Sequence, residues 1–450
     1  MLDLKKLNCI YFLGIGGIGM SALARYFKSF GINVYGYDKT RTPLIDELLN
    51  EGIKIHFEEN CDILPKNIDL VIYTPAIPLS HKELIYFKEN KFNLKKRAEV
   101  LGQITEQFKT IAIAGTHGKT TITSIISHIL SCANIPITSF IGGISKNINS
   151  NLLINKESKY IIVEADEYDR SFLTLHPDIA VISAMDADHL DIYKSKIYLD
   201  ESFKLFAKQI KENGLLIHKS GLNLSNQKGK TRLTYHLKEK SDLFVSNISI
   251  NKGKYIFDIS GIHNISNIEL GLPGLHNVEN ALAAIAVAKS IGIDDIVIKD
   301  ALSTYQGVKR RFDYIINTEK FVYIDDYAHH PAEIKACILS IRDLFPNKKI
   351  TGIFQPHLFT RTRDFADEFA SSLELLDNLL LLDIYPAREL PIDGINSQML
   401  FNKIKLTNKQ LVTKAEILSK LEAIKPEILL TMGAGDIDQL VKVIKQNYLN

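Results

Sequence analysis

The sequence predicts an α/β protein of three domains, over residues 1–106, 107–307 and 308–450. Its 450 residues are enough for about three domains of average size. Short apolar runs alternate with stretches of helical periodicity, which is typical of parallel sheets covered by helices on both faces. The alternation starts again after Glu106 and after Gly307, and the domain boundaries are therefore placed there.

The predicted elements follow one another in each third of the chain. The N-terminal third contains predicted strands at 9–13, 32–37 and 70–73 and predicted helices at 21–30 and 43–50. The central third contains predicted strands at 110–114, 160–163 and 179–183, a small antiparallel insertion at 219–270 and an alanine-rich buried helix at 277–290. The last third contains predicted strands at 321–324, 350–355, 379–384 and 428–432 and predicted helices at 331–344 and 365–376.

The composition indicates a cytoplasmic enzyme. The net charge is only +2, so neither nucleic acid nor an anionic membrane surface is an expected partner. No run of 18 uncharged apolar residues occurs, and the N-terminus lacks the pattern of a secretion signal. Four cysteines lie far apart, which argues against a disulfide framework or a structural zinc site. We expect a monomer or a homodimer.

The first glycine turn follows the strand at 9–13 and has the spacing G-x-G-x-x-G. Such a turn lets a pyrophosphate approach the backbone at a helix N-terminus, and an acidic residue at the end of the next strand is placed for a ribose. A turn that needs glycine only for packing is the alternative, and by itself the motif suggests a nicotinamide dehydrogenase. The residues concerned are Gly14, Gly16, Gly17, Gly19 and Asp38.

The second glycine turn follows the strand at 110–114 and favours a different class of enzyme. Its lysine is placed to reach the β- and γ-phosphates of a nucleotide, and its threonine hydroxyl is placed to bind Mg²⁺. Ile113 stands where a standard P-loop has its first glycine, which weakens the general P-loop interpretation. The turn consists of Gly115, Thr116, His117, Gly118, Lys119, Thr120 and Thr121.

Acidic and polar residues follow the next strands, at the sheet edge where α/β proteins bind ligands. Glu164 is the best-placed carboxylate for magnesium, whereas Asp169 is better explained as a solvated loop residue. His189 is an unusual magnesium ligand, and from its chemistry alone a metal role is no better than even. Asn277 and Asn280 share a face of the alanine-rich helix, where they would either bind adenine or a phosphate or cap the helix.

The last third supplies arginines, acids and histidines after two further strands. Arg310-Arg311, the segment from Asp325 to Pro331 and the segment from Gln355 to Arg363 lie at predicted strand ends. Arginines can stabilise charge on a transferring phosphoryl group or bind carboxylates, although each one alone could form only a surface salt bridge.

Together these motifs resemble the Mur ligase family, in family order and over the whole chain. The shorter phosphate loop of that family agrees with the departure at Ile113. The matching segments are GIGGIGM from Gly14, GTHGKTT from Gly115, EADEYD from Glu164, Asp188-His189, HNVEN from His276, RRFD from Arg310, DDYAHHP from Asp325, QPHLFTRTRDF from Gln355 and GAGDI from Gly433.

The resemblance implies three domains and assigns a substrate to each. A Rossmann-like N-terminal domain would bind a UDP-sugar, a central P-loop ATPase-like domain would bind ATP, and a Rossmann-like C-terminal domain would bind an amino acid. Lys119 and Thr120 would hold the ATP phosphates and Mg²⁺, and Glu164 and His189 would complete the metal site. The remaining residues carried over are Asn277 and Asn280 on the adenine side and Arg311, Asp326, His330 and Arg361 in the third domain.

The implied reaction is the ATP-dependent joining of L-alanine to UDP-N-acetylmuramate in peptidoglycan precursor synthesis. The sugar carboxylate would attack the γ-phosphate, and the alanine amine would then attack the resulting acyl phosphate. Many family members have a basic residue where this sequence has Leu358, so that contact is absent or comes from elsewhere, such as Arg363.

Three other functions compete with this interpretation. A recycling ligase would join a preformed peptide to the same sugar, but GIGGIGM favours the member that adds alanine. A dehydrogenase would bind NAD at the first turn and leave Lys119 without a role. A non-enzymatic nucleotide-binding module would bind ATP without chemistry.

Overall fold

The computed structural model describes residues 6–187, 190–224, 230–251, 253–387 and 389–449. They form two compact units. The first comprises Met1–Asn247, Asp258–Ile268 and Asn280–Tyr305, and the second comprises Ile248–Phe257, Glu269–Glu279 and Gln306–Asn450. These units do not test the predicted boundaries at 106/107 and 307/308, which stay predictions.

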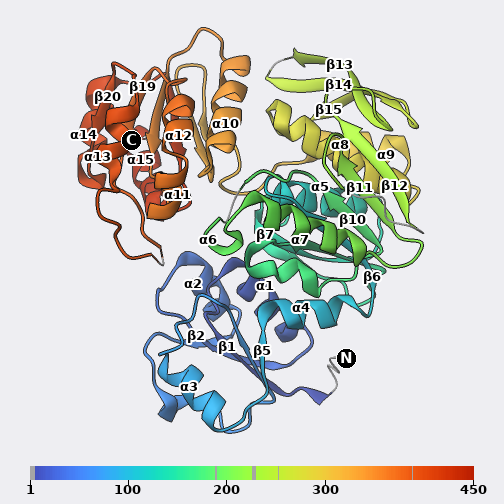
Figure 1. Ribbon diagram of the computed structural model, residues 1–450. Coiled ribbons are helices and arrows are strands. Elements are labelled where there is room, and N and C mark those ends of the chain that lie inside the picture. Colours follow the sequence, from blue (N-terminus) through green and yellow to red (C-terminus); the bar gives the residue numbers. More distant parts are fainter. Residues whose placement is uncertain (1–5, 188–189, 225–229, 252, 388, 450) are drawn as a thin grey trace. The chain divides into compact units, whose positions relative to one another are not determined.

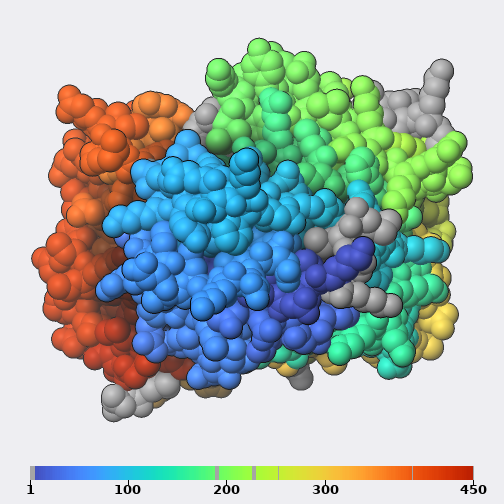
Figure 2. All heavy atoms as spheres, turned by 90° about the horizontal axis from the view of Figure 1, so that it is seen from below, coloured from blue at the N-terminus to red at the C-terminus, as the bar shows by residue number. Residues whose placement is uncertain are grey.

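A five-stranded parallel sheet with the order β3-β2-β1-β4-β5 forms the N-terminal region (Figure 1). This is the strand order of a Rossmann-like fold. Helices α1 and α4 pack on one face and α3 packs on the other, where Tyr11 lies. Figure 2 shows the region in blue to light blue as one continuous mass. Its elements are β1 (Cys9–Leu13), α1 (Ile18–Ser29), β2 (Asn33–Tyr37), α2 (Pro43–Asn50), β3 (Lys54–His56), η2 (Cys61–Ile63), β4 (Leu70–Tyr73), α3 (Lys82–Glu89), β5 (Leu94–Lys96) and α4 (Arg97–Thr105).

A ten-stranded sheet with the order β15-β14-β13-β12-β11-β10-β6-β9-β7-β8 follows. Its buried strands β6, β9 and β10 end at the second glycine turn and the acidic segments. The elements up to β10 are β6 (Lys109–Ala114), α5 (Lys119–Cys132), β7 (Ile137–Ser145), β8 (Ser150–Leu153), β9 (Tyr160–Ala165), η3 (Tyr168–Thr174) and β10 (Ile179–Ile182). The later elements are α6 (Leu190–Tyr193), α7 (Lys196–Lys208), β11 (Leu215–Lys219), β12 (Thr231–His236), β13 (Leu243–Asn251), β14 (Lys254–Gly261), β15 (Ile265–Leu270), α8 (Leu275–Ser290) and α9 (Asp295–Thr304).

The predicted antiparallel insertion at 219–270 is wrong in its first part. Strand β11 pairs parallel with β10, β12 pairs parallel with β11, and β13 pairs parallel with β12. These strands therefore extend the central sheet. Parallel neighbours are usually joined by a helical crossover, and the sequence between β11 and β12 contains no helical pattern that would have indicated such pairing.

A buried asparagine joins the N-terminal sheet region to the central sheet within the first unit. Asn151, on β8, donates from Nδ2 to Ile18 O at 2.7 Å and to Ser21 Oγ at 2.8 Å. Its Oδ1 accepts from Arg25 Nη1 at 2.5 Å. All three partners are on α1, so the β7–β8 hairpin is fixed to the helix that follows the first glycine turn.

The C-terminal region contains a six-stranded sheet with the order β16-β17-β21-β18-β19-β20, in which only the pairing of β16 with β17 is antiparallel. Helices α10, α12 and α13 contribute to one core and α14 and α15 to a second. Its elements are β16 (Asp313–Asn317), β17 (Val322–Asp326), α10 (Pro331–Leu344), β18 (Ile350–Phe354), α11 (Phe359–Asp364), α12 (Ala366–Leu373), β19 (Asn378–Leu381), α13 (Ser397–Lys403), β20 (Lys409–Leu411), η4 (Lys414–Glu416), α14 (Ile417–Ile424), β21 (Ile428–Met432), η5 (Asp436–Asp438) and α15 (Gln439–Leu449).

The four cysteines are free thiols. Within the described residues, no helix has the length and apolar character needed to cross a bilayer.

Candidate active site

The second glycine turn lies between β6 and α5, and two of its glycines are required by their surroundings. Gly115 has φ +134°, and a Cβ there would collide with Ser183 Oγ. Gly118 has φ +85°, and a Cβ there would lie 2.5 Å from Asn280 Oδ1. The structure thus brings Asn280 to the turn; its role on the nucleotide side stays a prediction. Left-handed backbone at Gly118 turns the chain into the first turn of α5.

Lys119, the first residue of α5, is held by two acceptors. Its Nζ donates to Gly115 O at 2.7 Å and to both carboxylate oxygens of Glu167, at 2.8 and 2.7 Å. The Glu167 side chain is fully buried. Burial alone lowers the pKa of the Lys119 ammonium, but Glu167 and the nearby Asp166 and Glu164 together raise it. The lysine therefore stays charged, and its side chain extends back over the glycine turn to Gly115 O.

Glu164 and Thr120 lie together, as expected for two metal-site residues. Thr120 Oγ1 donates to Glu164 Oε2 at 3.2 Å, and the Gly142 N–H donates to Glu164 Oε1 at 2.6 Å. A Cβ at Gly142 would overlap this carboxylate. Carboxylate and hydroxyl oxygens are ligands that suit Mg²⁺. His189, the third predicted metal residue, lies outside the described residues.

The rest of the turn is fixed by the segment after β10. Thr116 N donates to Ala184 O at 3.1 Å, and Asp186 N donates to Thr116 Oγ1 at 3.0 Å. The ring of His117 lies 3.4 Å from the Asp186 carboxylate, measured from Nε2 to Oδ2. Thr121 is buried in the first turn of α5.

Asn277, at the start of α8, makes a local contact. Its Nδ2 donates to Pro273 O at 2.6 Å, and its backbone N–H donates to Gly274 O at 2.9 Å. This amide group therefore stabilises the loop that leads into the helix. An adenine-side role for Asn277 stays a prediction.

The first glycine turn lies between β1 and α1. Gly14 N donates to Tyr37 O at 2.8 Å, and Gly16 N donates to Asp38 Oδ2 at 2.8 Å. One oxygen of the predicted ribose-binding acid therefore holds the turn itself. Gly17 has nothing within 3.7 Å of an added Cβ, so the approach to the backbone there is open.

In the second unit, Asp326 holds the segment that carries Arg311. Asp326 Oδ2 accepts from Phe312 N and Oδ1 accepts from Ala328 N, both at 2.7 Å. Burial raises the pKa of Asp326 to about 6, although Arg311 and the two N–H groups act in the opposite direction. The Arg311 guanidinium lies 5.2 Å from the centre of the Tyr327 ring. Asp326 thus fixes the backbone next to Arg311; a role toward a ligand stays a prediction.

His330 and Arg361 are both buried in this unit. His330 is the N-cap residue of α10, and its Nδ1 accepts from Ala332 N at 3.3 Å. Arg361 Nη1 lies 3.5 Å from His357 Nδ1. Leu358 is 3% exposed with φ +69°. Arg363, the suggested substitute for a basic group there, forms an ion pair with Asp364 at 2.7 Å.

Two residues near these turns escaped the sequence analysis. Glu167 was one of four acids in its segment, and the requirement of Lys119 for a counter-charge was the signal that could have identified it. Arg97, at the start of α4, lies against Gly19. It lies between the predicted strand at 70–73 and the predicted boundary at Glu106, where no motif was found, so no sequence signal marked it.

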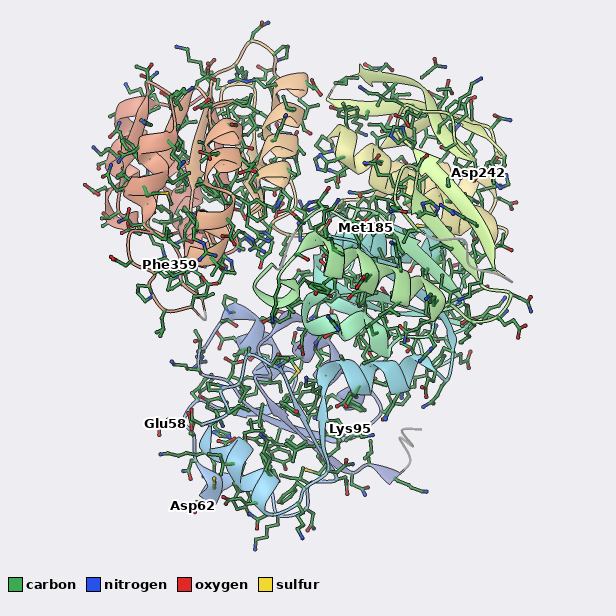
Figure 3. The ribbon with its side chains drawn as sticks, viewed as in Figure 1. Glu58, Asp62, Lys95, Met185, Asp242 and Phe359 are labelled. Atoms are coloured by element: carbon green, nitrogen blue, oxygen red, sulfur yellow. The ribbon has the colours of Figure 1, made fainter. Side chains whose placement is uncertain are left out.

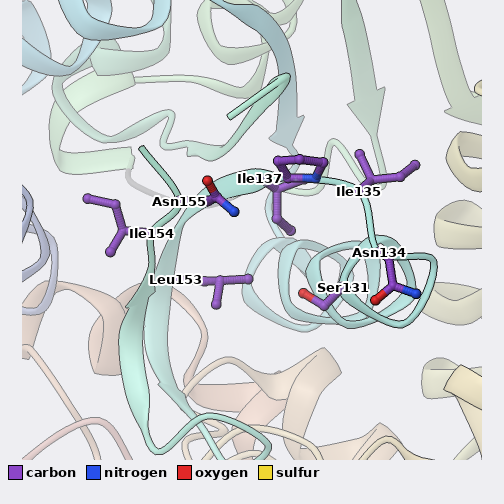
Figure 4. Close-up of a pocket in the computed structure, with 8 residues that line it drawn as sticks. Ser131, Asn134, Ile135, Ile137, Leu153, Ile154 and Asn155 are labelled. Carbon is purple, nitrogen blue, oxygen red and sulfur yellow. The ribbon is translucent and has the colours of Figure 1, made fainter. Parts of the chain in front are cut away.

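A separate pocket of about 280 Å³ lies at the far end of α5 (Figure 4). Residues 131 and 134–137 line one side and residues 153–155 line the other. None of these is a predicted site residue.

His276, beside Arg311 and Glu333, should make stability depend on pH. Burial lowers its pKa to about 4; Glu333 opposes this shift and Arg311 adds to it. The unfolded chain therefore binds the extra proton first, and stability falls by about 1–3 kcal/mol as pH drops from 6.5 to 4. His276→Gln should lack this part of the fall in urea midpoints measured between pH 4.5 and 8. Parallel profiles for the two proteins would contradict the assignment.

Comparison with known proteins agrees with this arrangement. Residues 9–109 match the Mur ligase family catalytic domain, residues 113–288 the Mur ligase middle domain, and residues 310–437 the Mur ligase glutamate ligase domain. The UDP-N-acetylmuramate–L-alanine ligase of Flavobacterium psychrophilum is 51% identical over 450 residues, which is 99% of each chain. That of Parabacteroides distasonis is 47% identical over 453 residues, covering 99% of this chain and 98% of the relative.

Solved structures give the same result. The crystal structure of the UDP-N-acetylmuramate-alanine ligase of Thermotoga maritima superposes with a TM-score of 0.84 at 28% identity, over 98% of this chain and 99% of the other. A murein peptide ligase from Psychrobacter arcticus shares the fold, with a TM-score of 0.75 at 23% identity over the same shares of the two chains. The resemblance and the α/β fold class inferred from the motifs are confirmed. With matches of this length and identity over nearly the whole sequence, the chain belongs to the Mur ligase family.

Proposed function

We propose that this chain is an ATP-dependent ligase that joins L-alanine to the carboxylate of UDP-N-acetylmuramate, a C–N bond-forming step of peptidoglycan precursor synthesis. The observation that carries the proposal is the charged Lys119, buried beside Glu167 and next to the Thr120–Glu164 pair. The names of the full-length relatives support the choice of alanine and of the sugar. The proposal places the reaction in the cytoplasm, where ATP and nucleotide-sugars are available.

The proposal assigns one substrate to each predicted range. Residues 1–106 bind the UDP-sugar at the first glycine turn, with Asp38 toward the ribose. Residues 107–307 bind ATP at the second turn, with Asn277 and Asn280 on the adenine side. Residues 308–450 bind alanine and bring Arg311, Asp326, His330 and Arg361 to the reaction.

The chemistry proceeds in two steps. A carboxylate is a poor acyl donor, so a carboxylate oxygen of the sugar first attacks the γ-phosphorus, the bond to the β-phosphate oxygen breaks, and ADP leaves. The amine of L-alanine then attacks the acyl carbon, loses a proton and expels inorganic phosphate. Lys119 and Arg311 counter the charge on the transferring phosphoryl group.

Magnesium fits the residues that the structure describes at this turn. Thr120 and Glu164 would hold it, together with His189, and it would supply further positive charge to the phosphates. The N–H of Gly142 and the missing Cβ at that position keep the Glu164 carboxylate in place for this purpose.

The decisive experiment measures phosphate release from ATP with UDP-N-acetylmuramate and, separately, L-alanine, glycine, L-serine or a tripeptide. We expect release that depends on alanine, with oxygen-18 from the sugar carboxylate appearing in the phosphate. Release only with the tripeptide would identify the recycling ligase instead. NAD reduction, or ATP binding without any release, would support the dehydrogenase or the non-enzymatic module.

A further inference from the structure

Gly19, the last glycine of the G-x-G-x-x-G motif in the first turn, leaves space for the side chain of Arg97. A Cβ at Gly19 would lie 2.9 Å from Nη1 and 3.4 Å from Cζ of Arg97. At Gly14 and Gly16 the closest atoms to an added Cβ are instead aliphatic carbons of Thr74 and Ile45, at 2.9 and 2.6 Å. The usual reason for this glycine is close packing of helix on strand. Here the head group of a flexible side chain occupies the space.

The Arg97 guanidinium is three-quarters buried and poorly matched by its neighbours. Its side chain is 24% exposed, and its closest carboxylate is that of Asp166, 3.9 Å from Nη2. Among the described residues, the Arg97 guanidinium makes this one long ion pair and no hydrogen bond. The preceding residue, Lys96, has a closer partner in Asp169 at 3.2 Å. Because a guanidinium has five N–H donors and the ion pair with Asp166 is long, Arg97 keeps donors that an anionic ligand beside Gly19 could engage.

The turn itself indicates which anion fits. Helix α1 begins at Ile18, and neither a side-chain cap nor an acidic residue occupies its first turn. Gly17 leaves the backbone accessible. Lys95, labelled in Figure 3, is on β5. Helix α4 begins two residues later, at Arg97. A diphosphate over this turn would meet the N–H groups of α1 on one side and a planar guanidinium fork on the other.

We propose that Arg97 binds the diphosphate of the UDP-sugar and that Gly19 is glycine to admit its guanidinium. This inference rests on the proposed function, since it names a further binding residue of the same substrate. Arg97 belongs to α4, so the substrate diphosphate would connect the first turn with the end of the N-terminal region.

The test measures UDP binding to the full-length protein by calorimetry. Arg97→Ala should weaken UDP about ten-fold to a hundred-fold, the range for losing hydrogen bonds to a charged group, and Arg97→Lys should recover only part of it. Lys28→Ala removes one positive charge from the far end of α1, where Nζ contacts Gly52 O, and should leave UDP binding unchanged. Binding of a non-hydrolysable ATP analogue should be unchanged in every variant, which shows that each one is folded.

A double-mutant cycle tests whether Gly19 is glycine to admit the Arg97 guanidinium or to allow close packing of the backbone. Gly19→Ala should displace the guanidinium and weaken UDP to the same extent as Arg97→Ala. In the Arg97→Ala background the added methyl group should have little further effect. If Gly19→Ala weakens UDP binding equally in the wild-type and Arg97→Ala proteins, Gly19 serves backbone packing and the inference is overturned.

Two further results would also overturn it. One is a UDP affinity within two-fold of the wild type for Arg97→Ala. The other is weakened binding of UDP-N-acetylmuramate without weakened binding of UDP, because the arginine would then hold the sugar carboxylate. Failure of the proposed function is recognised separately, by wild-type protein that binds UDP normally yet releases no phosphate with alanine.

Discussion

Replacing Lys119 by alanine is expected to lower the rate of alanine-dependent phosphate release at least about 100-fold. The ammonium carries a full positive charge within the second turn, and it is already oriented by Gly115 O and Glu167. Removing one oriented donor from a site of developing charge typically has an effect of this size. The measurement is steady-state phosphate release at saturating substrates.

The control for this variant lies on β6, the strand that leads into the second glycine turn. Lys109→Ala removes an exposed lysine at the opposite end of β6 and should leave the rate within two-fold. UDP binding at the first turn should persist in Lys119→Ala, because that turn does not contain Lys119. A variant that retains wild-type turnover would refute a phosphate-binding role for the lysine, whereas joint loss of UDP binding would indicate unfolding.

Replacing Glu167 by glutamine is expected to lower the free energy of unfolding by about 3–5 kcal/mol. The Glu167 carboxylate is fully buried and accepts two hydrogen bonds from an ammonium that is itself only 17% exposed. Removing one member of a buried ion pair leaves the other charge without compensation. The measurement is unfolding in urea, followed by a probe in the first unit.

A double variant tests whether the lost stability comes from the uncompensated charge of Lys119 or from the loss of the Glu167 carboxylate itself. In Lys119→Met/Glu167→Gln neither charge remains, so most of the lost stability should return while the activity stays absent. Asp169→Asn, which removes the half-exposed partner of Lys96, is the control and should change stability by less than about 1 kcal/mol. If the double variant loses as much free energy of unfolding as the two single variants together, the ion pair does not explain the stability.

Local patterns predicted much of the fold. The predicted helices at 43–50 and 331–344 and strands at 70–73 and 428–432 have the same bounds as α2, α10, β4 and β21. Each is bounded by residues with a local structural effect: Pro43 and Pro331 start helices, and Gly433, with φ +146°, follows a fully buried strand. The predicted helix at 365–376 was less accurate: α12 covers only Ala366–Leu373, and α11 (Phe359–Asp364) just before it was not predicted.

The candidate site was predictable where the chemistry is local to one motif. Both glycine turns follow the ends of buried strands, and the Thr120–Glu164 pair follows from the ends of β6 and β9, which are parallel neighbours in one sheet. The position of Glu167 was not predictable, because the backbone turns through left-handed conformations at Asp169 and Arg170. The position of Arg97 beside Gly19 likewise depends on how α4 packs against α1, and the hydrophobic periodicity of the sequence does not encode that packing.

The attachment of the β7–β8 hairpin to α1 constrains any exchange of parts between family members. A chimera that grafts residues 1–106 of a relative onto this chain would bring foreign partners to Asn151, whose amide meets Ile18, Ser21 and Arg25. The same hairpin carries Gly142, which holds Glu164. A functional graft therefore has to include residues 137–153 or restore those three partners, because a mismatched joint would also disturb the position of the Glu164 carboxylate.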